Sequence, residues 1–202
     1  TLFQSLLYQK VSPNSLNISG YPKISTAVEA SILNKLSKAK PLASFTVKNS
    51  RFVVEYTRKL QYFIQFFVDP PLIFNEKNEV LKPSELKKMF FDSKEVQERA
   101  IVLLNSSLFF WYFIAFSDCR NVNAREILCF PTNLDTLSTD SENHRLAEEM
   151  LSNLKDNSIF LNRNDKRAGR LRIQSFQPRL SKTVADKIDK LLSMHYGFTE
   201  EE

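Results

Sequence analysis

Residues 103–131 have the sequence LLNSSLFFWYFIAFSDCRNVNAREILCFP, and this stretch decides the fold. Its first half is a nearly continuous run of apolar and aromatic residues. Such density favours an element buried in the core over an exposed platform on which bases stack. The second half is polar and ends at Phe130-Pro131. The pattern therefore predicts a core element that delivers guanidinium and amide groups to the surface, where such groups contact phosphates and base edges.

Four side chains supply these groups: Arg120, Asn121, Asn123 and Arg125. Arginine and asparagine make bidentate contacts to guanine and adenine, respectively. The same residues can instead cap the preceding element and pair with Glu126. The residue types alone leave both interpretations open.

The overall composition is that of a globular protein with one large domain or two small ones. Of the 202 residues, 43% are hydrophobic and 25% are charged. The chain has only three glycines, at positions 20, 169 and 197, so it can assemble neither a dinucleotide-binding glycine turn nor a P-loop. The net charge of +5 favours polyanionic partners.

The cysteines and the apolar runs indicate the compartment. Cys119 and Cys129 have no histidine nearby in the sequence, which predicts two reduced, mostly buried thiols in a cytoplasmic protein. The N-terminus lacks the pattern of a signal peptide. The longest apolar run, Leu108–Phe116, is far shorter than the roughly 20 residues that cross a bilayer, so no membrane contact is expected. The absent initial Met and the final Glu200-Glu201-Glu202 suggest a segment of a longer protein.

The helix and strand signals predict an α+β fold, with a mixed or antiparallel sheet and several packed helices. Capping boxes begin helices at Thr26, Asp92 and Thr139, and the second helix is expected to run on toward Trp111. A final helix over 183–195 stops at Gly197, a residue suited to a left-handed C-terminal cap.

The remaining signals are shorter. Residues 1–20 predict a strand or a short helix and then a polar loop, and residues 43–74 predict extended structure with a hairpin turn at Asn49-Ser50. Pro83-Ser84-Glu85 is expected to open a short helix. Residues 158–177 predict two strands around a polar turn at 164–169.

Three candidate catalytic patterns fail on their chemistry. Asp69-Pro70-Pro71-Leu72 resembles the tetrapeptide of amino-methyltransferases, but Leu72 has no aromatic face to stack on a flipped base. Glu85-x-Lys87 is half of a nuclease motif without converging carboxylates. His144 and His195 lack the spacing of a catalytic triad or a metal site. No catalytic residue, metal ligand or cofactor site is therefore predicted in this chain.

The basic stretch 163–182 is the strongest physical signal of a binding surface. A strand here would place the guanidiniums of Arg170 and Arg172 on one face. Such a ribbon can contact phosphates, although a solvated face of a basic protein is the simpler alternative. Its cations, opposed by Asp165 alone, are Arg163, Lys166, Arg167, Arg170, Arg172, Arg179 and Lys182.

Three pieces of the chain, in order, resemble the C-terminal target-recognition region of bacterial adenine-N6 DNA methyltransferases. The related proteins include fused type IIG restriction-methylases and, more distantly, the TaqI-like C-terminal specificity domain. The pieces are Tyr21-Pro22-Lys23-Ile24 with Ile32-Leu33-x-Lys35-Leu36, then 104–131, and then Ile188-Asp189-Lys190-Leu191 with Tyr196-Gly197-Phe198-Thr199-Glu200-Glu201-Glu202.

The resemblance implies a non-catalytic segment that clamps and reads double-stranded DNA in the bacterial cytoplasm. The adenine-methylating domain, with its S-adenosylmethionine, would lie upstream in the same parent chain. Residues 1–135 would form the recognition core and 136–202 a helix–strand–helix extension. The DNA-contacting candidates are Lys23 and the group at 120–125, which match the resemblance, with Arg163, Lys166, Arg167, Arg170 and Arg172, which rest on charge alone. The alternative is a protein–protein docking module of a restriction–modification complex.

Overall fold

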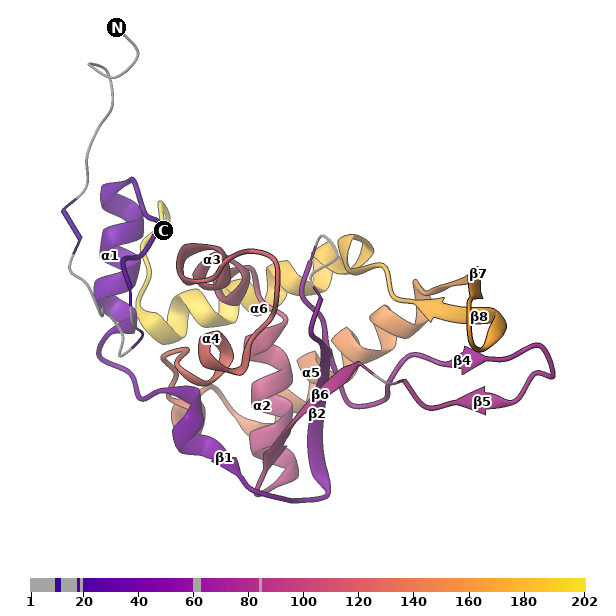
Figure 1. Ribbon diagram of the computed structural model, residues 1–202. Helices are drawn as coiled ribbons and strands as arrows, with labels where there is room; N and C mark the ends of the chain where they lie inside the picture. The colour runs from indigo at the N-terminus through magenta and orange to yellow at the C-terminus, as the bar shows by residue number, and fades with distance from the viewer. Residues whose placement is uncertain (1–9, 12–17, 19, 60–62, 84) are drawn as a thin grey trace, which may run out of the picture.

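The computed structural model describes residues 10–11, 18, 20–59, 63–83 and 85–202. These residues form an α+β fold in which a mainly helical body carries a projecting β-sheet (Figure 1). The expected α+β class is confirmed. The strand or short helix expected over residues 1–20 lies almost wholly outside the described residues.

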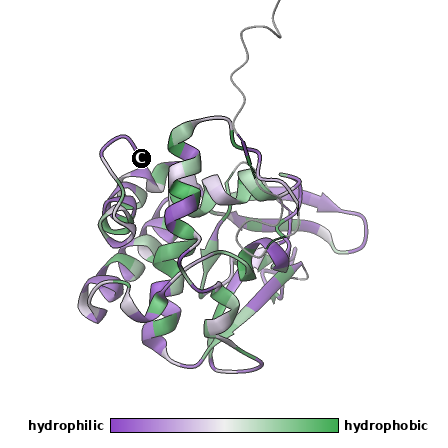
Figure 2. Cartoon of the chain, turned by 90° about the vertical axis from the view of Figure 1, so that its left-hand side faces the viewer, coloured by the Kyte–Doolittle hydropathy of each residue, from purple (hydrophilic) through white to green (hydrophobic). Residues whose placement is uncertain are grey.

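Helices make up most of the body. Figure 2 shows hydrophobic and hydrophilic residues interleaved along most of them, as amphipathic helices require. The α-helices are α1 (Ala27–Leu36), α2 (Lys94–Leu104), α3 (Ser107–Phe116), α4 (Ala124–Leu128), α5 (Asp140–Asp156) and α6 (Lys182–Tyr196). Short 3-10 helices are η3 (Leu42–Phe45), η4 (Leu134–Thr136) and η5 (Pro178–Ser181).

The strands form two antiparallel sheets. The first has the order β1-β6-β2-β3 and lies in the body, and the second has the order β5-β4-β8-β7 and projects from it. The strands are β1 (Thr46–Val47), β2 (Phe52–Thr57), β3 (Phe66–Phe67), β4 (Ile73–Phe74), β5 (Val80–Leu81), β6 (Leu86–Phe91), β7 (Ile159–Asp165) and β8 (Gly169–Ser175).

The aromatic stretch is a buried helix, as its density predicts. Phe109, Tyr112 and Phe113 of α3 have no exposed surface. The ring of Phe130, beyond the polar segment, meets those of Phe109 and Tyr112 at centroid distances of 5.2 and 4.8 Å. Burying a phenylalanine stabilises the fold by about 1.5–3 kcal/mol, so this cluster anchors both ends of the stretch.

The prediction of a single helix from Asp92 toward Trp111 is wrong. The chain bends by 68° between α2 and α3. Asn105 causes the break because its side chain bonds both the backbone N–H and the carbonyl of Phe66. Ser106 then caps α3 by accepting a hydrogen bond from the N–H of Phe109 at 3.0 Å. The cap of α2 is Ser93, one residue later than expected.

The first sheet corrects two further predictions. β1 and β2 are not a hairpin around Asn49-Ser50, because both pair with β6, which lies between them. The short helix expected to open at Pro83-Ser84-Glu85 is replaced by the strand β6, which begins at Leu86, and Ser84 itself lies outside the described residues. Pairing with β2 over six residues, Phe52–Thr57 against Leu86–Phe91, outweighs the local helix signal.

The C-terminal predictions are confirmed. Thr139 caps α5 through the N–H of Glu142, and α6 ends at Gly197 in the left-handed conformation, with φ of 65°. The β7–β8 hairpin has its turn between Asp165 and Gly169. Strand β5 was not predicted from the sequence, because two residues are too few to show the alternation of apolar and polar residues that is typical of a strand.

Residues from both sides of position 135 share one hydrophobic cluster, and β4 pairs with β8. The division into 1–135 and 136–202 stays a prediction. In the described part of the chain, no single helix is long and apolar enough to span a membrane; only α2 and α3 taken together pass that length and composition test, as a bent pair.

Candidate nucleic-acid interface

The turn of the β7–β8 hairpin is closed by Asp165. Its carboxylate accepts hydrogen bonds from the N–H groups of Ala168 at 3.0 Å and Arg167 at 2.9 Å. These backbone bonds hold the pKa of Asp165 below its usual value. The one acidic group of the hairpin is thus engaged by its own backbone, while the side chains around it remain cationic.

A second contact joins the hairpin to the β4–β5 loop. Glu76 accepts a hydrogen bond from the N–H of Arg170 at 2.8 Å. The same carboxylate lies 3.0 Å from the point that a Cβ would occupy at Gly169, whose φ is 72°. Glycine therefore meets both a conformational and a steric requirement at this position. The two β-hairpins of the second sheet are held together at this end.

One face of this sheet gathers cations, amides and aromatic rings. Residues opposite each other in antiparallel strands share a face. Arg172 lies opposite Asn162 of β7 on one side and Phe74 of β4 on the other, and Arg170 lies opposite Asn164. The Cζ atom of Arg172 is 4.7 Å from the ring centroid of Phe74 and 4.9 Å from that of Phe160. We call this the arginine face, defined by Phe74, Phe160, Asn162, Asn164, Arg170 and Arg172.

The other face of the hairpin is mainly apolar. Leu161 lies opposite Ile173, and Arg163 lies opposite Leu171. Ile159 and Leu161 are 48% and 49% exposed. We call this the leucine face, and its cation is Arg163. Both faces of the hairpin are therefore open, and they differ in chemistry.

The cations of the hairpin stand out from those of the neighbouring helices in their ion pairing. Among the described residues, no salt bridge is formed by Arg163, Lys166, Arg167, Arg170 or Arg172. In contrast, Lys155, Lys182 and Lys187 on the neighbouring helices each pair with a carboxylate. Cations elsewhere, such as Lys38 and Arg120, also form no salt bridge among the described residues, so the hairpin is distinguished by having five such cations within residues 163–172.

The Lys23 segment and the 117–125 loop meet at the end of α3. The N–H of Lys23 donates to the carbonyl of Ala115 at 2.9 Å, and its ammonium donates to that of Ser117 at 2.6 Å. Lys23 therefore binds the C-terminal carbonyls of α3, where a cation is favourable. The ammonium also lies 3.5 Å from Cys119 Sγ, and this free thiol is exposed, contrary to the burial predicted for it.

The loop itself is built around Asp118. Its carboxylate accepts hydrogen bonds from the N–H groups of Asn121 at 3.0 Å and Arg120 at 2.9 Å, which lower its pKa. Next to this turn, the N–H of Val122 donates to the carbonyl of Arg58 at 2.7 Å. The turn leaves the Arg120 side chain exposed, without a salt bridge in the described part of the chain.

Arg125 is engaged with Glu126. Its Nη2 and Nε atoms lie 2.8 and 3.2 Å from Glu126 Oε1, and the glutamate side chain is 1% exposed. Asn123 stands at the N-cap position of α4 without a side-chain capping bond, and donates to the carbonyl of Asn121 at 3.4 Å. The pairing alternative raised for this segment is therefore present for Arg125.

The candidate residues thus form two groups. Lys23 lies with the candidates of the 117–125 loop. The five candidate cations of residues 163–172 lie on the hairpin, well separated from α3 and α4 in Figure 1. The sequence reasoning missed Phe74, Phe160, Asn162 and Asn164. Phe160, Asn162 and Asn164 occupy every second position of 159–165, a spacing typical of one face of a strand. Their position next to Arg172, however, depends on the pairing of β7 with β8.

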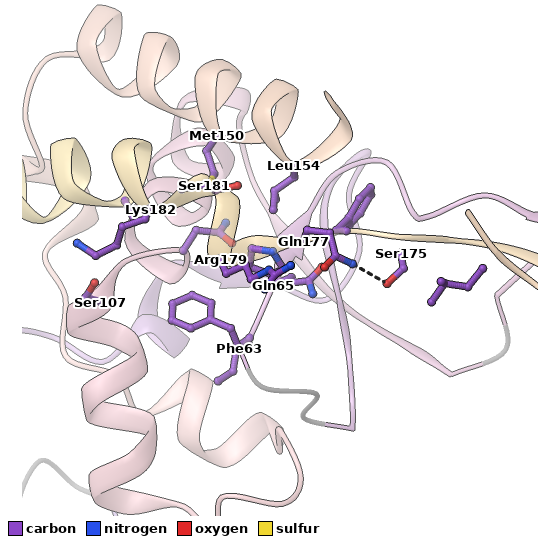
Figure 3. Close-up of a pocket in the computed structure, with 16 residues that line it drawn as sticks. Phe63, Gln65, Ser107, Met150, Leu154, Ser175, Gln177, Arg179, Ser181 and Lys182 are labelled. Atoms are coloured by element: carbon purple, nitrogen blue, oxygen red, sulfur yellow. Dashed lines mark hydrogen bonds between the residues drawn. The ribbon is translucent and has the colours of Figure 1, made fainter. Parts of the chain in front are cut away.

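A cleft of about 800 Å³ lies at the base of the hairpin (Figure 3). Apolar side chains of Met150 and Leu154 line it, together with Leu161 from the leucine face and the ring of Phe63. The amide of Asn105 also lines it but is saturated by backbone partners. The cleft can hold an apolar group, and Lys182, which also lines it, pairs with Asp186.

Glu98, His144 and Glu148 form one cluster with metal-ligand character, which the sequence reasoning missed. Their ligand atoms lie within 4.8 Å of one another. His144 Nδ1 is 2.8 Å from Glu98 Oε1, and the ammonium of Lys94 is 3.2 Å from the same oxygen. These two cationic or donating groups already satisfy the most buried carboxylate of the cluster.

Comparison of the chain with models of protein families, with curated protein sequences and with solved structures finds no match. The projecting β7–β8 hairpin carries five cations that form no salt bridge among the described residues.

Proposed function

We propose that this chain is the DNA target-recognition segment of an adenine-N6 DNA methyltransferase from a restriction–modification system. It binds double-stranded DNA and positions it for a catalytic domain elsewhere in the parent chain. The observation that supports this proposal is the β7–β8 hairpin, which projects from the body with five cations and no salt bridge among the described residues.

The physical basis is phosphate neutralisation. Each cation that meets a phosphate releases counterions from DNA, which supplies affinity without sequence preference. A two-stranded antiparallel ribbon also fits the width of the major groove. Arg120 and Lys23, which lie near the C-terminal end of α3, would contact the phosphate backbone of the same duplex.

The methyl donor belongs to the catalytic domain. S-adenosylmethionine needs a glycine-rich loop. The three glycines of this chain are at positions 20, 169 and 197 and are far apart in sequence. Gly169 ends the turn of the β7–β8 hairpin, and Gly197 ends α6. The described residues do not fit this cofactor. The segment contributes binding and orientation rather than chemistry.

Charge reversal on the hairpin tests the proposal. We expect Arg170→Glu with Arg172→Glu to weaken binding to any duplex by at least tenfold, measured by fluorescence anisotropy. The control is Lys38→Glu with Lys48→Glu, which changes the net charge equally at exposed positions away from the hairpin. Equal affinity of the two double variants would mean that net charge, and not the hairpin, determines binding.

A second candidate function is docking to a protein of the same restriction–modification complex. The leucine face favours it, because Ile159 and Leu161 are each about half exposed beside an apolar cleft. Under this function, Ile159→Ser with Leu161→Ser abolishes association with the partner protein and leaves DNA affinity unchanged. Loss of DNA affinity in that variant would argue against docking as the role of this face.

A further inference from the structure

We propose that the arginine face reads base edges, with Asn162 and Asn164 recognising adenines and Arg170 recognising a guanine. This inference rests on the proposed function, since it requires that the hairpin bind duplex DNA. Under this inference the hairpin determines which DNA sequence is bound, whereas its positive charge alone would give affinity for any duplex.

The amides of Asn162 and Asn164 are available for a ligand. Both residues are exposed, and neither side chain forms a hydrogen bond within the described residues. Gln174, the third amide on this face, is different. Its Oε1 accepts from the N–H of Leu72 at 3.0 Å and its Nε2 donates to Ser158 Oγ at 2.8 Å. The structure thus separates one amide that holds the sheet together from two that face solvent.

The chemistry of the free groups matches the major groove. An asparagine amide donates to and accepts from the edge of adenine in a bidentate pair, and an arginine does the same with the two acceptors of guanine. The guanidinium of Arg170 has no partner among the described residues and lies across the hairpin from Asn164. Amide and guanidinium are therefore presented side by side.

The spacing of the two amides also matches. An antiparallel strand rises about 3.4 Å per residue, so side chains two residues apart on one face are about 7 Å apart. Base pairs are stacked about 3.4 Å apart, so the same distance covers two base-pair steps. Asn162 and Asn164 can therefore address alternate base pairs. β7 is the edge strand of its sheet, which leaves it accessible to a groove.

Arg172 has a positioning role on this face. Its guanidinium lies against both Phe74 and Phe160, 4.7 and 4.9 Å from the ring centroids, which are themselves 5.9 Å apart. This arrangement fixes a positive charge next to Asn162 and keeps the strand face in one orientation. The leucine face has no comparable set, because its hairpin residues are apolar except for Arg163, Asp165 and Ser175.

The test is selection of preferred sites from a randomised duplex library by the 202-residue chain and its variants. Asn162→Ala with Asn164→Ala removes both amides. Arg170→Lys keeps the charge and removes the bidentate fork. The matched control is Arg51→Lys, the same substitution at an exposed position outside the hairpin. All four positions are exposed, and thermal melting checks that each variant folds.

We expect the wild-type chain to select adenines at two positions two base pairs apart, with a guanine close by. The Asn double variant should lose the adenine preference by roughly 5- to 100-fold, and Arg170→Lys should lose the guanine preference alone. Arg51→Lys should select the wild-type site, and all variants should keep the wild-type dependence of affinity on salt.

Two results would overturn the inference while leaving the proposed function intact. One is duplex binding by the wild-type chain without any sequence preference, and the other is an unchanged preferred site in both arginine-face variants. A wild-type chain that binds no duplex, or that binds single strands in its place, would overturn the inference and the proposed function together.

Discussion

Arg172 lies over the ring of Phe74, with its Cζ atom 4.7 Å from the ring centroid. The two residues come from strands that are distant in sequence and are paired in the sheet, Phe74 in β4 and Arg172 in β8. The second sheet therefore does more than extend the hairpin. It fixes the orientation of one of the cations that we assign to DNA binding.

Replacing Phe74 by Leu should weaken duplex binding by about two- to fivefold, because a cation–π contact at an exposed site contributes about 0.5–1 kcal/mol. The charge is unchanged, so the salt dependence of the affinity should stay the same. Val80→Ala, at the exposed position paired with Phe74, is the control and should leave affinity unchanged. An equal effect of both substitutions would show that Phe74 acts only by supporting the sheet.

Arg125→Ala should lower the free energy of unfolding by about 1–2 kcal/mol, because it leaves the buried carboxylate of Glu126 without its cation. Arg125 is half exposed, so solvent reduces the effect below that of a fully buried pair. Arg120→Ala, at the exposed turn, should leave stability unchanged and weaken DNA binding. Chemical denaturation and anisotropy measure the two quantities. Reversed effects of the two variants would contradict the roles that the structure gives these arginines.

Tyr112→Phe should raise the free energy of unfolding by about 1 kcal/mol. The Tyr112 hydroxyl is buried and has no hydrogen-bond partner in the described structure, and burial raises its pKa above the usual value. Tyr196→Phe is the matched control, since the Tyr196 hydroxyl donates to the carbonyl of Pro131 at 3.0 Å. That substitution should destabilise the protein by about 1 kcal/mol. Destabilisation by both substitutions would mean that Tyr112 has a partner.

Glu202→Gln should lower stability in a pH-dependent way. Hydrogen bonds from Lys35, Ser31 and the N–H of Thr199 lower the pKa of Glu202 to about 2, from 4.5. A carboxyl group with a lowered folded-state pKa stabilises the protein fully above its unfolded pKa. The difference between wild type and variant should therefore be largest above pH 4.5 and should vanish as the pH falls to about 2. Glu201→Gln, at an exposed position, is the control and should show no such trend.

Local signals in the sequence predict much of this fold. Thr26 and Thr139 cap their helices as expected, and Gly197 ends the last one. In each case the determining contacts lie within a few residues of one another. The same holds for the alternation of Arg170 and Arg172, which places both on one face of β8.

The failures come from contacts that are distant in sequence. Asn105 breaks the α2–α3 helix because Phe66 is its partner, and β6 is a strand because β2 pairs with it. For the candidate site, the sequence located the cations of 163–172 but not the arginine face. Phe74 joins that face only through the pairing of β4 with β8, which no local pattern encodes.

The central claim is that the hairpin binds DNA through its unpaired cations, and a salt titration tests it most directly. The measurement is the dissociation constant of the 202-residue chain for a duplex between about 50 and 200 mM salt. If three to five cations meet phosphates, the logarithm of the association constant should fall against the logarithm of the salt concentration with a slope of roughly −2.7 to −4.5. The same affinity at low and high salt, or no binding at either, would contradict the account.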